Sequence, residues 1–299
     1  MIEAAILTLI RERLTSALRR PRGPLHVLRV DGRVAGRFAG DRAARLAAFD
    51  RVFERRGDGL AFAPAQDGFE RRTEALDQVA RTLAAEGRLS PWRAERYAVG
   101  PGFGARPWFL LERAAARFFG IRTYAAHVNG LAGPRDDPGL WFARRSPRKA
   151  IDPGQLDNLV GGGIATGQTV AATVVKEAAE EAGIPALLAR QAAPTGAVHV
   201  FRQTPDGIQD ETIFVHDLWL PADFTPTPTD GEVAAFRQVD FATAAQLIAQ
   251  SEGPDRVTAD ASLVVLDCLL RHGAIPPDAP DYLPLEALRH PAPGGDAWA

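Results

Sequence analysis

One stretch of the chain, Gly161 to Ile184, constrains its fold more than any other part of the sequence. The stretch opens with three consecutive glycines, which predict a loop whose backbone can approach a ligand closely. A helix of about three turns follows, and it ends at Gly183 and Pro185, a pair of residues typical of a helix C-terminus. The stretch therefore predicts a loop, a helix and a second loop in close succession.

Three glutamates share one face of this predicted helix. Glu177, Glu180 and Glu181 stand at positions i, i+3 and i+4, which places their Cβ atoms about 5–6 Å apart. No lysine follows four residues later to offset their mutual repulsion, so a divalent cation would stabilise the group. Carboxylate oxygens suit Mg²⁺ or Mn²⁺. A solvated acidic face is the common alternative, and the helix alone leaves both interpretations open.

The pattern of apolar residues along the sequence changes near residue 115. The first part predicts mostly helices, at Ile2–Leu18, Arg42–Arg55 and Arg71–Glu86, with a hairpin that turns at Asp31-Gly32. From Gly120 onward, short apolar runs predict strands that alternate with helices, which indicates a mixed α/β or α+β core. We therefore expect an accessory domain over residues 1–115 and a second domain over residues 116–299, with an irregular tail from Pro276.

Composition excludes several classes of protein. The 35 Lys and Arg residues against 37 Asp and Glu residues give a net charge of −2, which does not favour a nucleic-acid partner. The single cysteine, Cys268, excludes an intramolecular disulfide and a cysteine-based zinc cluster. Neither a membrane-spanning apolar run nor a signal-peptide pattern is present. We expect a cytoplasmic protein that binds neither membranes nor nucleic acid.

The Gly161–Ile184 stretch resembles the Nudix box, G-x5-E-x7-R-E-U-x-E-E-x-G-U, in which U is an aliphatic residue. Gly162 is the first glycine, and the matching positions that follow are Glu177, Ala178, Glu180, Glu181, Gly183 and Ile184. The resemblance implies a Nudix fold, an α/β/α sandwich in which the box forms a loop-helix-loop. It also implies that Glu177, Glu180 and Glu181 hold one or more Mg²⁺ or Mn²⁺ ions, and that water hydrolyses a diphosphate linked to another group.

Two positions depart from the box. Gln168 replaces the first glutamate, and Lys176 replaces the arginine. Lysine keeps the positive charge but lacks the bidentate fork of arginine, and glutamine keeps an oxygen acceptor but lacks the negative charge. We expect weaker metal binding as a result.

The resemblance extends to nearly the whole chain. Residues Gly120 to about Pro284 look like the Nudix domain that is fused to thiamine pyrophosphokinase in fungi and stands alone in plants and bacteria. The motifs that carry this likeness are His127-Val128-Asn129-Gly130, Leu140-Trp141, Arg144-Arg145-Ser146, Leu156-Asp157-Asn158 and Asp230-Gly231-Glu232-Val233. The stretches Arg71-Arg72-Thr73-Glu74 and Trp92-Arg93-Ala94-Glu95 look like its N-terminal domain. The group is associated with hydrolysis of damaged or analogue thiamine diphosphate, such as the oxo and oxy forms, to the monophosphate.

Several other residues are candidates for the site, each with an ordinary alternative. Arg144, Arg145 and Lys149 would clamp the diphosphate, with Gly162 and Gly163 beside it, or the basic residues would form a solvated loop. Glu232 would be a further catalytic carboxylate or an ordinary turn acid. His127 and Asn129 alternate on one predicted strand, where they either face the site or are held by hydrogen bonds.

Together these features predict a Nudix-type diphosphatase with an N-terminal accessory domain. Its substrate would be a small-molecule diphosphate, and the accessory domain would close over the organic part of that substrate or form a homodimer interface. Two alternatives stay open: hydrolysis of a nucleoside diphosphate derivative, and a degenerate Nudix module that binds a diphosphate without cleaving it. A carboxylate, either a box glutamate or Glu232, would take the proton from the attacking water.

Overall fold

The computed structural model describes residues 2–89 and 91–290. The α-helices within these ranges are α1 Ala4–Ala17, α2 Gly40–Ala47, α3 Phe69–Ala85, α4 Ala116–Phe119, α5 Val170–Ala182, α6 Ala186–Ala189, α7 Phe241–Ala249, α8 Ala259–Arg271 and α9 Tyr282–Leu288. The strands are β1 His26–Val30, β2 Arg33–Phe38, β3 Phe53–Arg56, β4 Gly59–Phe62, β5 Arg96–Val99, β6 Phe109–Glu112, β7 Arg122–Ala132, β8 Gly139–Arg145, β9 Leu156–Asn158, β10 Val160–Gly163, β11 Ala193–Thr204, β12 Gly207–Trp219 and β13 Val233–Asp240. Two 3₁₀ turns, η1 Pro64–Gln66 and η2 Arg113–Ala115, complete these elements.

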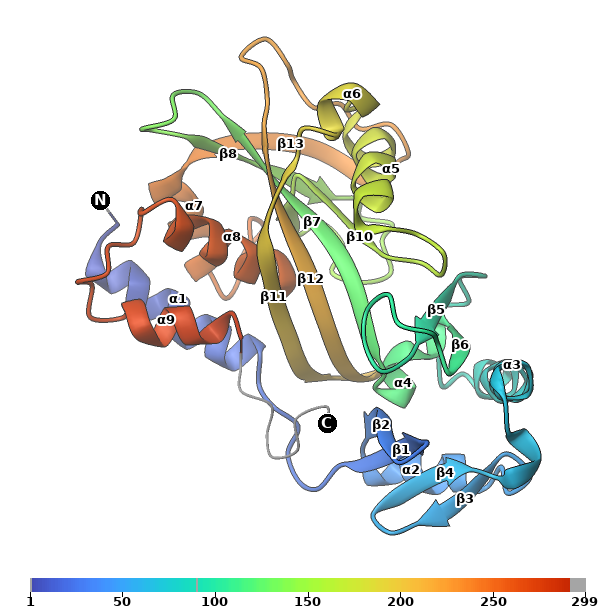
Figure 1. The fold of residues 1–299 in the computed structure, drawn as a ribbon. Helices are drawn as coiled ribbons and strands as arrows, with labels where there is room; N and C mark the ends of the chain where they lie inside the picture. The colour runs from blue at the N-terminus through green and yellow to red at the C-terminus, as the bar shows by residue number, and fades with distance from the viewer. Residues whose placement is uncertain (1, 90, 291–299) are drawn as a thin grey trace.

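A seven-stranded sheet forms the centre of the molecule. Its main path runs β11-β12-β7-β8-β13, while β10 pairs with β7 and β9 pairs with β8. Helices α7 and α8 cover one face of the sheet, and α5 and α6 cover the other (Figure 1). Separate apolar clusters fill the two interfaces, because alternate residues of each strand point to opposite faces. The predicted α/β/α sandwich is therefore confirmed.

The part of the chain before this sheet contains a second, smaller sheet. Its order is β2-β1-β4-β3, it packs with α2 and α3, and the hairpin β5-β6 lies beside it (Figure 1). The β1-β2 turn has positive φ at both Asp31 and Gly32, as the Asp-Gly signal predicts. Backbone contacts join this part to the rest of the chain: Arg37 N donates to Gly120 O at 3.0 Å, Gly36 bridges Ile121, and Thr166 N donates to Arg96 O at 3.0 Å.

Helix α1 packs on the central sheet's helices and not on the small sheet that follows it. Leu7, Ile10 and Leu14 are buried in the cluster that includes α7 and α8. Buried Arg13 donates to Ile248 O at 2.5 Å, to Ser262 Oγ at 2.7 Å and to Val257 O. Figure 1 shows α1 beside α9, both on the outside of α7 and α8. The first helix thus ties the two ends of the chain together.

The structure corrects three predictions of local structure. The Arg42–Arg55 helix ends at Ala47, and β3 follows because Phe53 packs on Phe62 and Phe119, with ring centroids 5.5 and 6.3 Å apart. The three glycines belong to strand β10 and not to a loop. The tail after Pro276 contains α9, whose Leu285 is buried in the core, while residues 291–299 lie outside the described residues.

The alternation of strands and helices predicted after Gly120 is confirmed. No helix among the described residues is long and apolar enough to cross a membrane.

Candidate active site

Strand β10 contains three glycines because three side chains approach its backbone closely. A Cβ at Gly162 would lie 2.5 Å from the carboxyl carbon of Glu177, and one at Gly163 would lie 2.5 Å from the Tyr97 hydroxyl. A Cβ at Gly161 would lie 2.9 Å from the His127 ring. At these distances an added Cβ would force the neighbouring side chain to shift, so the triplet permits the close packing of the Glu177, His127 and Tyr97 side chains on β10.

Helix α5, which carries the three glutamates, holds Glu181 against strand β10. Thr169 caps the helix by accepting a hydrogen bond from Ala172 N at 3.1 Å, and Gly183 ends it in the left-handed conformation. Glu181 is 7% exposed, and its Oε2 accepts a hydrogen bond from Gly161 N at 3.0 Å. Burial raises the pKa of this carboxyl to about 8. Glu181 is therefore a buried group, although the spacing alone suggested an exposed face.

Glu177 and Glu180 are joined by Lys176, the residue that replaces the box arginine. The Lys176 ammonium donates to Glu177 at 3.0 Å and to Glu180 at 2.8 Å. Lys176 precedes Glu180 by four residues, and its positive charge partly offsets the repulsion among the three glutamates. No lysine that follows the glutamates is needed for this effect. Burial raises the pKa of Glu177, while the side chain of Glu180 is half-exposed. Glu177 and Glu181 lie against β10, and Glu180 lies nearer the surface.

A pocket of about 200 Å³ lies beside β10, between the central sheet, the N-terminus of α8 and the accessory part of the chain. Its floor is made of small residues on neighbouring strands, among them Gly161, Gly163, Thr123 and Ala125. The small floor leaves room for a ligand where adjacent strands would otherwise present larger side chains.

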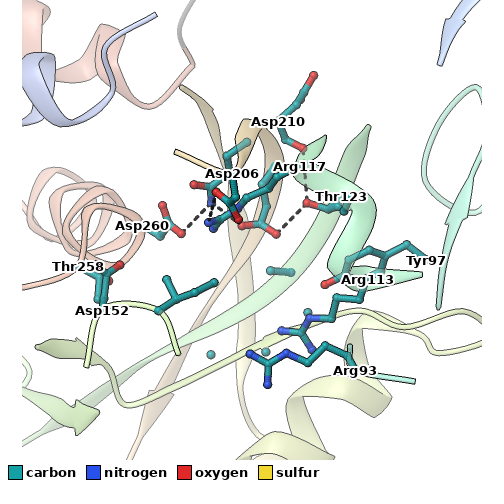
Figure 2. Close-up of a pocket in the computed structure, with 18 of the residues that line it drawn as sticks. Arg93, Tyr97, Arg113, Arg117, Thr123, Asp152, Asp206, Asp210, Thr258 and Asp260 are labelled. Carbon is teal, nitrogen blue, oxygen red and sulfur yellow. Dashed lines mark hydrogen bonds and ion pairs between the residues drawn. The ribbon is translucent and has the colours of Figure 1, made fainter. Parts of the chain in front are cut away.

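Residues before the central sheet form one wall of this pocket. Arg93, Tyr97 and Arg113 line it, and Figure 2 shows Arg93 and Arg113 side by side. Arg113 pairs with Glu95 at 2.5 Å, and burial raises the pKa of the Tyr97 phenol, which keeps it a hydrogen-bond donor. The sequence analysis did not identify these residues as part of the site, because only the tertiary structure brings β5 and β6 next to β10.

The predicted basic clamp is divided between two places. Arg145 and Lys149 line the pocket; Arg145 pairs with Asp157 at 2.6 Å, and Lys149 pairs with Glu232. Partial burial opposes ionisation of Glu232, but the hydrogen bond and charge of Lys149 lower the pKa of that carboxyl overall. Arg144 does not line the pocket, since its guanidinium is bound by Asp255 and by the carbonyl oxygens of residues 154 and 254.

The two candidates on β7 also separate. His127 lines the pocket and its Nδ1 lies 2.7 Å from Asn158 Oδ1. Asn129 is fully buried elsewhere and donates to Asp217 at 3.1 Å. Gln168 is exposed in the turn before α5.

The donor set beside β10 fits a hard divalent cation. Glu177 and Glu181 offer carboxylate oxygens, and Asp157 is close enough for its charge to raise the pKa of Glu181 further. Carboxylate oxygens are the ligands that Mg²⁺ and Mn²⁺ prefer. A bound cation would offset the burial of both carboxylates.

Comparisons with known proteins agree with this geometry. A family model described as "NUDIX domain" matches residues 124–261, and one described as "Domain of unknown function (DUF4743)" matches residues 10–123. The chain is 39% identical over 234 residues to "Nudix hydrolase 24, chloroplastic" of Arabidopsis thaliana, covering 78% of this chain and 63% of that protein. It is 39% identical over 216 residues to "Nudix hydrolase 20, chloroplastic" of the same plant, covering 72% of this chain and 57% of that protein.

A further relative is the "Uncharacterized protein YJR142W" of Saccharomyces cerevisiae, 34% identical over 242 residues, covering 75% of this chain and 69% of that protein. The chain thus spans less than two thirds of each plant relative, and slightly more than two thirds of the yeast one. The box helix, the sandwich and these matches agree: residues 124–261 match the Nudix domain, and most of the chain is similar to plant Nudix hydrolases.

Proposed function

We propose that this protein hydrolyses a diphosphate linked to an organic group, with Mg²⁺ or Mn²⁺ as cofactor. The observation that carries the proposal is the convergence of Arg93, Arg113, Arg145 and Lys149 on the pocket beside Gly161–Gly163. A diphosphate needs several cationic donors, and guanidinium groups match its oxygens in pairs. The buried carboxylates of the box helix lie directly against the same strand.

The roles of the side chains follow from their positions. Glu177 and Glu181 would hold the metal, which supplies charge neutralisation at the phosphoryl oxygens and a lowered pKa for a bound water. The four basic residues would orient the diphosphate. For this, Lys149 would exchange its ion pair with Glu232 for a contact with the diphosphate. That exchange would free the Glu232 carboxylate, which is already ionised, to accept a proton from water.

We further propose that the substrate is a damaged or analogue form of thiamine diphosphate, which is converted to the monophosphate. The support is the likeness of the motifs described above to the thiamine-associated Nudix group. The pocket is consistent with it, because Arg93, Tyr97 and Arg113 of the accessory part add to the wall that would surround the organic half of the substrate.

One observation favours the non-catalytic alternative, a diphosphate-binding module. The Lys176 ammonium already pairs with Glu177 and Glu180 and offsets part of their negative charge, so less charge remains for a metal. Hydrolysis of a nucleoside diphosphate derivative is the other alternative, because the diphosphate end of the pocket does not select the organic group.

Chromatographic detection of the monophosphate products, on a panel of substrates with Mg²⁺ or Mn²⁺, separates these functions, because ADP-ribose and nucleoside diphosphate sugars yield two phosphomonoesters and no inorganic phosphate. The panel contains oxo- and oxy-thiamine diphosphate, thiamine diphosphate, ADP-ribose and a nucleoside diphosphate sugar. We expect a higher kcat/KM on an analogue than on thiamine diphosphate, above all on the oxy form, whose thiazolium ring keeps its positive charge. A wide preference for ADP-ribose or the sugar would refute the thiamine assignment, and binding without turnover across the panel would refute the enzyme.

A further inference from the structure

The proposed diphosphate site uses only one end of the pocket. The other end is lined by four carboxylates: Asp206, Asp210, Glu211 and Asp260. Figure 2 shows Asp206 and Asp260 on the side of the pocket opposite Arg93 and Arg113. The pocket is therefore basic beside β10 and acidic at its far end, where α8 begins.

Three of these carboxylates have basic partners within the protein. The pairs are Asp206 with Arg117 at 3.5 Å, Asp210 with Arg122 at 3.1 Å and with His199 at 2.8 Å, and Asp260 with Arg202 at 3.4 Å. Their charges are offset within the protein, so none of the three requires a ligand.

Glu211 differs from them, because both of its oxygens are held by neutral donors. Thr123 Oγ1 donates to Oε1 at 2.9 Å, and Gln209 Nε2 donates to Oε2 at 3.0 Å. Within residues 2–89 and 91–290, Glu211 has no ion pair. The charge of Glu211 contributes to raising the pKa of the Arg113 guanidinium on the basic wall. Arg113 itself pairs with Glu95.

The hydrogen bonds fix this carboxylate in place. Gln209 is 3% exposed, and it also donates to Asp260 Oδ2 at 2.9 Å and accepts from Arg202 at 2.8 Å. Asp260 Oδ1, on the same wall, receives no hydrogen bond from the described part of the chain but lies 3.4 Å from the Arg202 guanidinium. Glu211 is thus held in place by a buried amide that also binds its paired neighbour Asp260.

We propose that Glu211 forms a subsite for an organic cation, so that the substrate is a diphosphate whose organic group carries a positive charge or a protonated amine. This inference rests on the proposed function, since it assigns the diphosphate to the basic end. Glu211 lies two residues from Ile213, which pairs with Ala125, and Ala125 pairs with Gly163. Two strand spacings and a two-residue rise place the Cα atoms of Gly163 and Glu211 about 12 Å apart. Ile121 and Ile208 also line the pocket, and the strand register places them beyond Glu211 as seen from Gly163, where they add apolar surface beside the organic group.

Two matched ligands test the subsite by binding alone. Hexyl and 6-aminohexyl methylenediphosphonate have the same length and the same non-hydrolysable head, and they differ only in a terminal ammonium. Calorimetry on the full chain with Mg²⁺ should show that the wild type binds the aminohexyl ligand about tenfold or more tightly than the hexyl one, the gain typical of a hydrogen bond to a charged group. Glu211→Gln should bring this ratio close to one, because it removes the charge and keeps the shape.

Glu252→Gln is the matched control, because it removes a glutamate charge at an exposed position away from the pocket. It should keep the wild-type ratio. Equal binding of the two ligands by the wild-type protein would overturn the subsite, whether or not the Glu211 variant folds, and so would a ratio that survives in folded Glu211→Gln.

Turnover of hexyl and 6-aminohexyl diphosphate separates this inference from the proposed function. If the binding ratio depends on Glu211 but neither ester releases phosphate with any of the metals, the hydrolase proposal fails and the subsite stands. If both esters are hydrolysed with equal KM, the hydrolase proposal stands and the subsite fails.

Discussion

At the scale of single residues, the box glutamates differ in environment even though they share one helix. Glu181 is buried and bound to the backbone of β10, while Glu180 is half-exposed and paired with Lys176. The common spacing of i, i+3 and i+4 places three carboxylates on adjoining positions, but the neighbours of the helix decide which of them are desolvated. The proposed metal site therefore depends most on Glu177 and Glu181.

The variant Glu181→Gln tests this assignment. We expect turnover to fall by about 100-fold or more, because a metal-facing carboxylate is lost. The metal-free protein should be as stable as the wild type or more so, since the amide removes a buried acid without changing its size. Activity and thermal unfolding in EDTA are the two measurements. Near-normal turnover, or a large loss of stability, would show that Glu181 has only a structural role.

At the scale of elements, strand β10 and helix α5 act as one unit. Gly162→Ala should push the Glu177 carboxyl away from its place, because the added Cβ would lie 2.5 Å from the carboxyl carbon. We expect a weaker apparent affinity for Mg²⁺ and lower kcat. Gly102→Ala is the control, since Gly102 has an ordinary backbone conformation and nothing within 4 Å of the added atom. If both variants bind Mg²⁺ equally well, Glu177 is not a ligand.

Strand β12 and helix α8 are joined by a buried ion pair that predicts how stability depends on pH. Burial opposes the charge of Asp217, but hydrogen bonds from His272, Arg271 and Asn129 lower the pKa of its carboxyl overall. Because the folded-state pKa lies below the unfolded value of about 3.8, Asp217 stabilises the fold above that pH, and the contribution is lost as the pH falls further.

We expect Asp217→Asn to lower the free energy of unfolding at pH 7 by about 1.5–3 kcal/mol, because it weakens charged hydrogen bonds from Arg271 and His272 while Arg271 keeps its ion pair with Asp267. The variant should also lose less stability than the wild type between pH 4 and pH 2. Chemical denaturation at a series of pH values measures both effects. If the free energy of unfolding of the variant falls as steeply between pH 4 and pH 2 as that of the wild type, other carboxyls control acid unfolding.

At the scale of the whole molecule, α1 makes the two parts of the chain depend on each other. A fragment that starts near residue 115 would lack α1, and the surfaces of α7 and α8 that α1 covers would face water. We expect such a fragment to aggregate, whereas Leu14→Ala in the full chain should fold with a loss of about 2–5 kcal/mol. Circular dichroism and size-exclusion chromatography check both expectations. A monomeric, folded fragment would show that α1 is dispensable for the central sheet.

The sequence by itself determined the local features of this protein. Thr169 and Gly183 set the ends of α5, Asp31-Gly32 set the first hairpin, and the alternating apolar runs set most strands of the central sheet, because each of these signals acts through a few neighbouring residues.

Only the tertiary structure decided which residues share the pocket. Arg113 and Glu211 are far apart in the sequence but face one pocket, and α1 packs on helices at the other end of the chain. Packing likewise buries Glu181. It also brings Asp255 to Arg144, which therefore binds this carboxylate and not the pocket. The hydrophobic effect drives this packing but has no direction, so local patterns do not encode which surfaces meet.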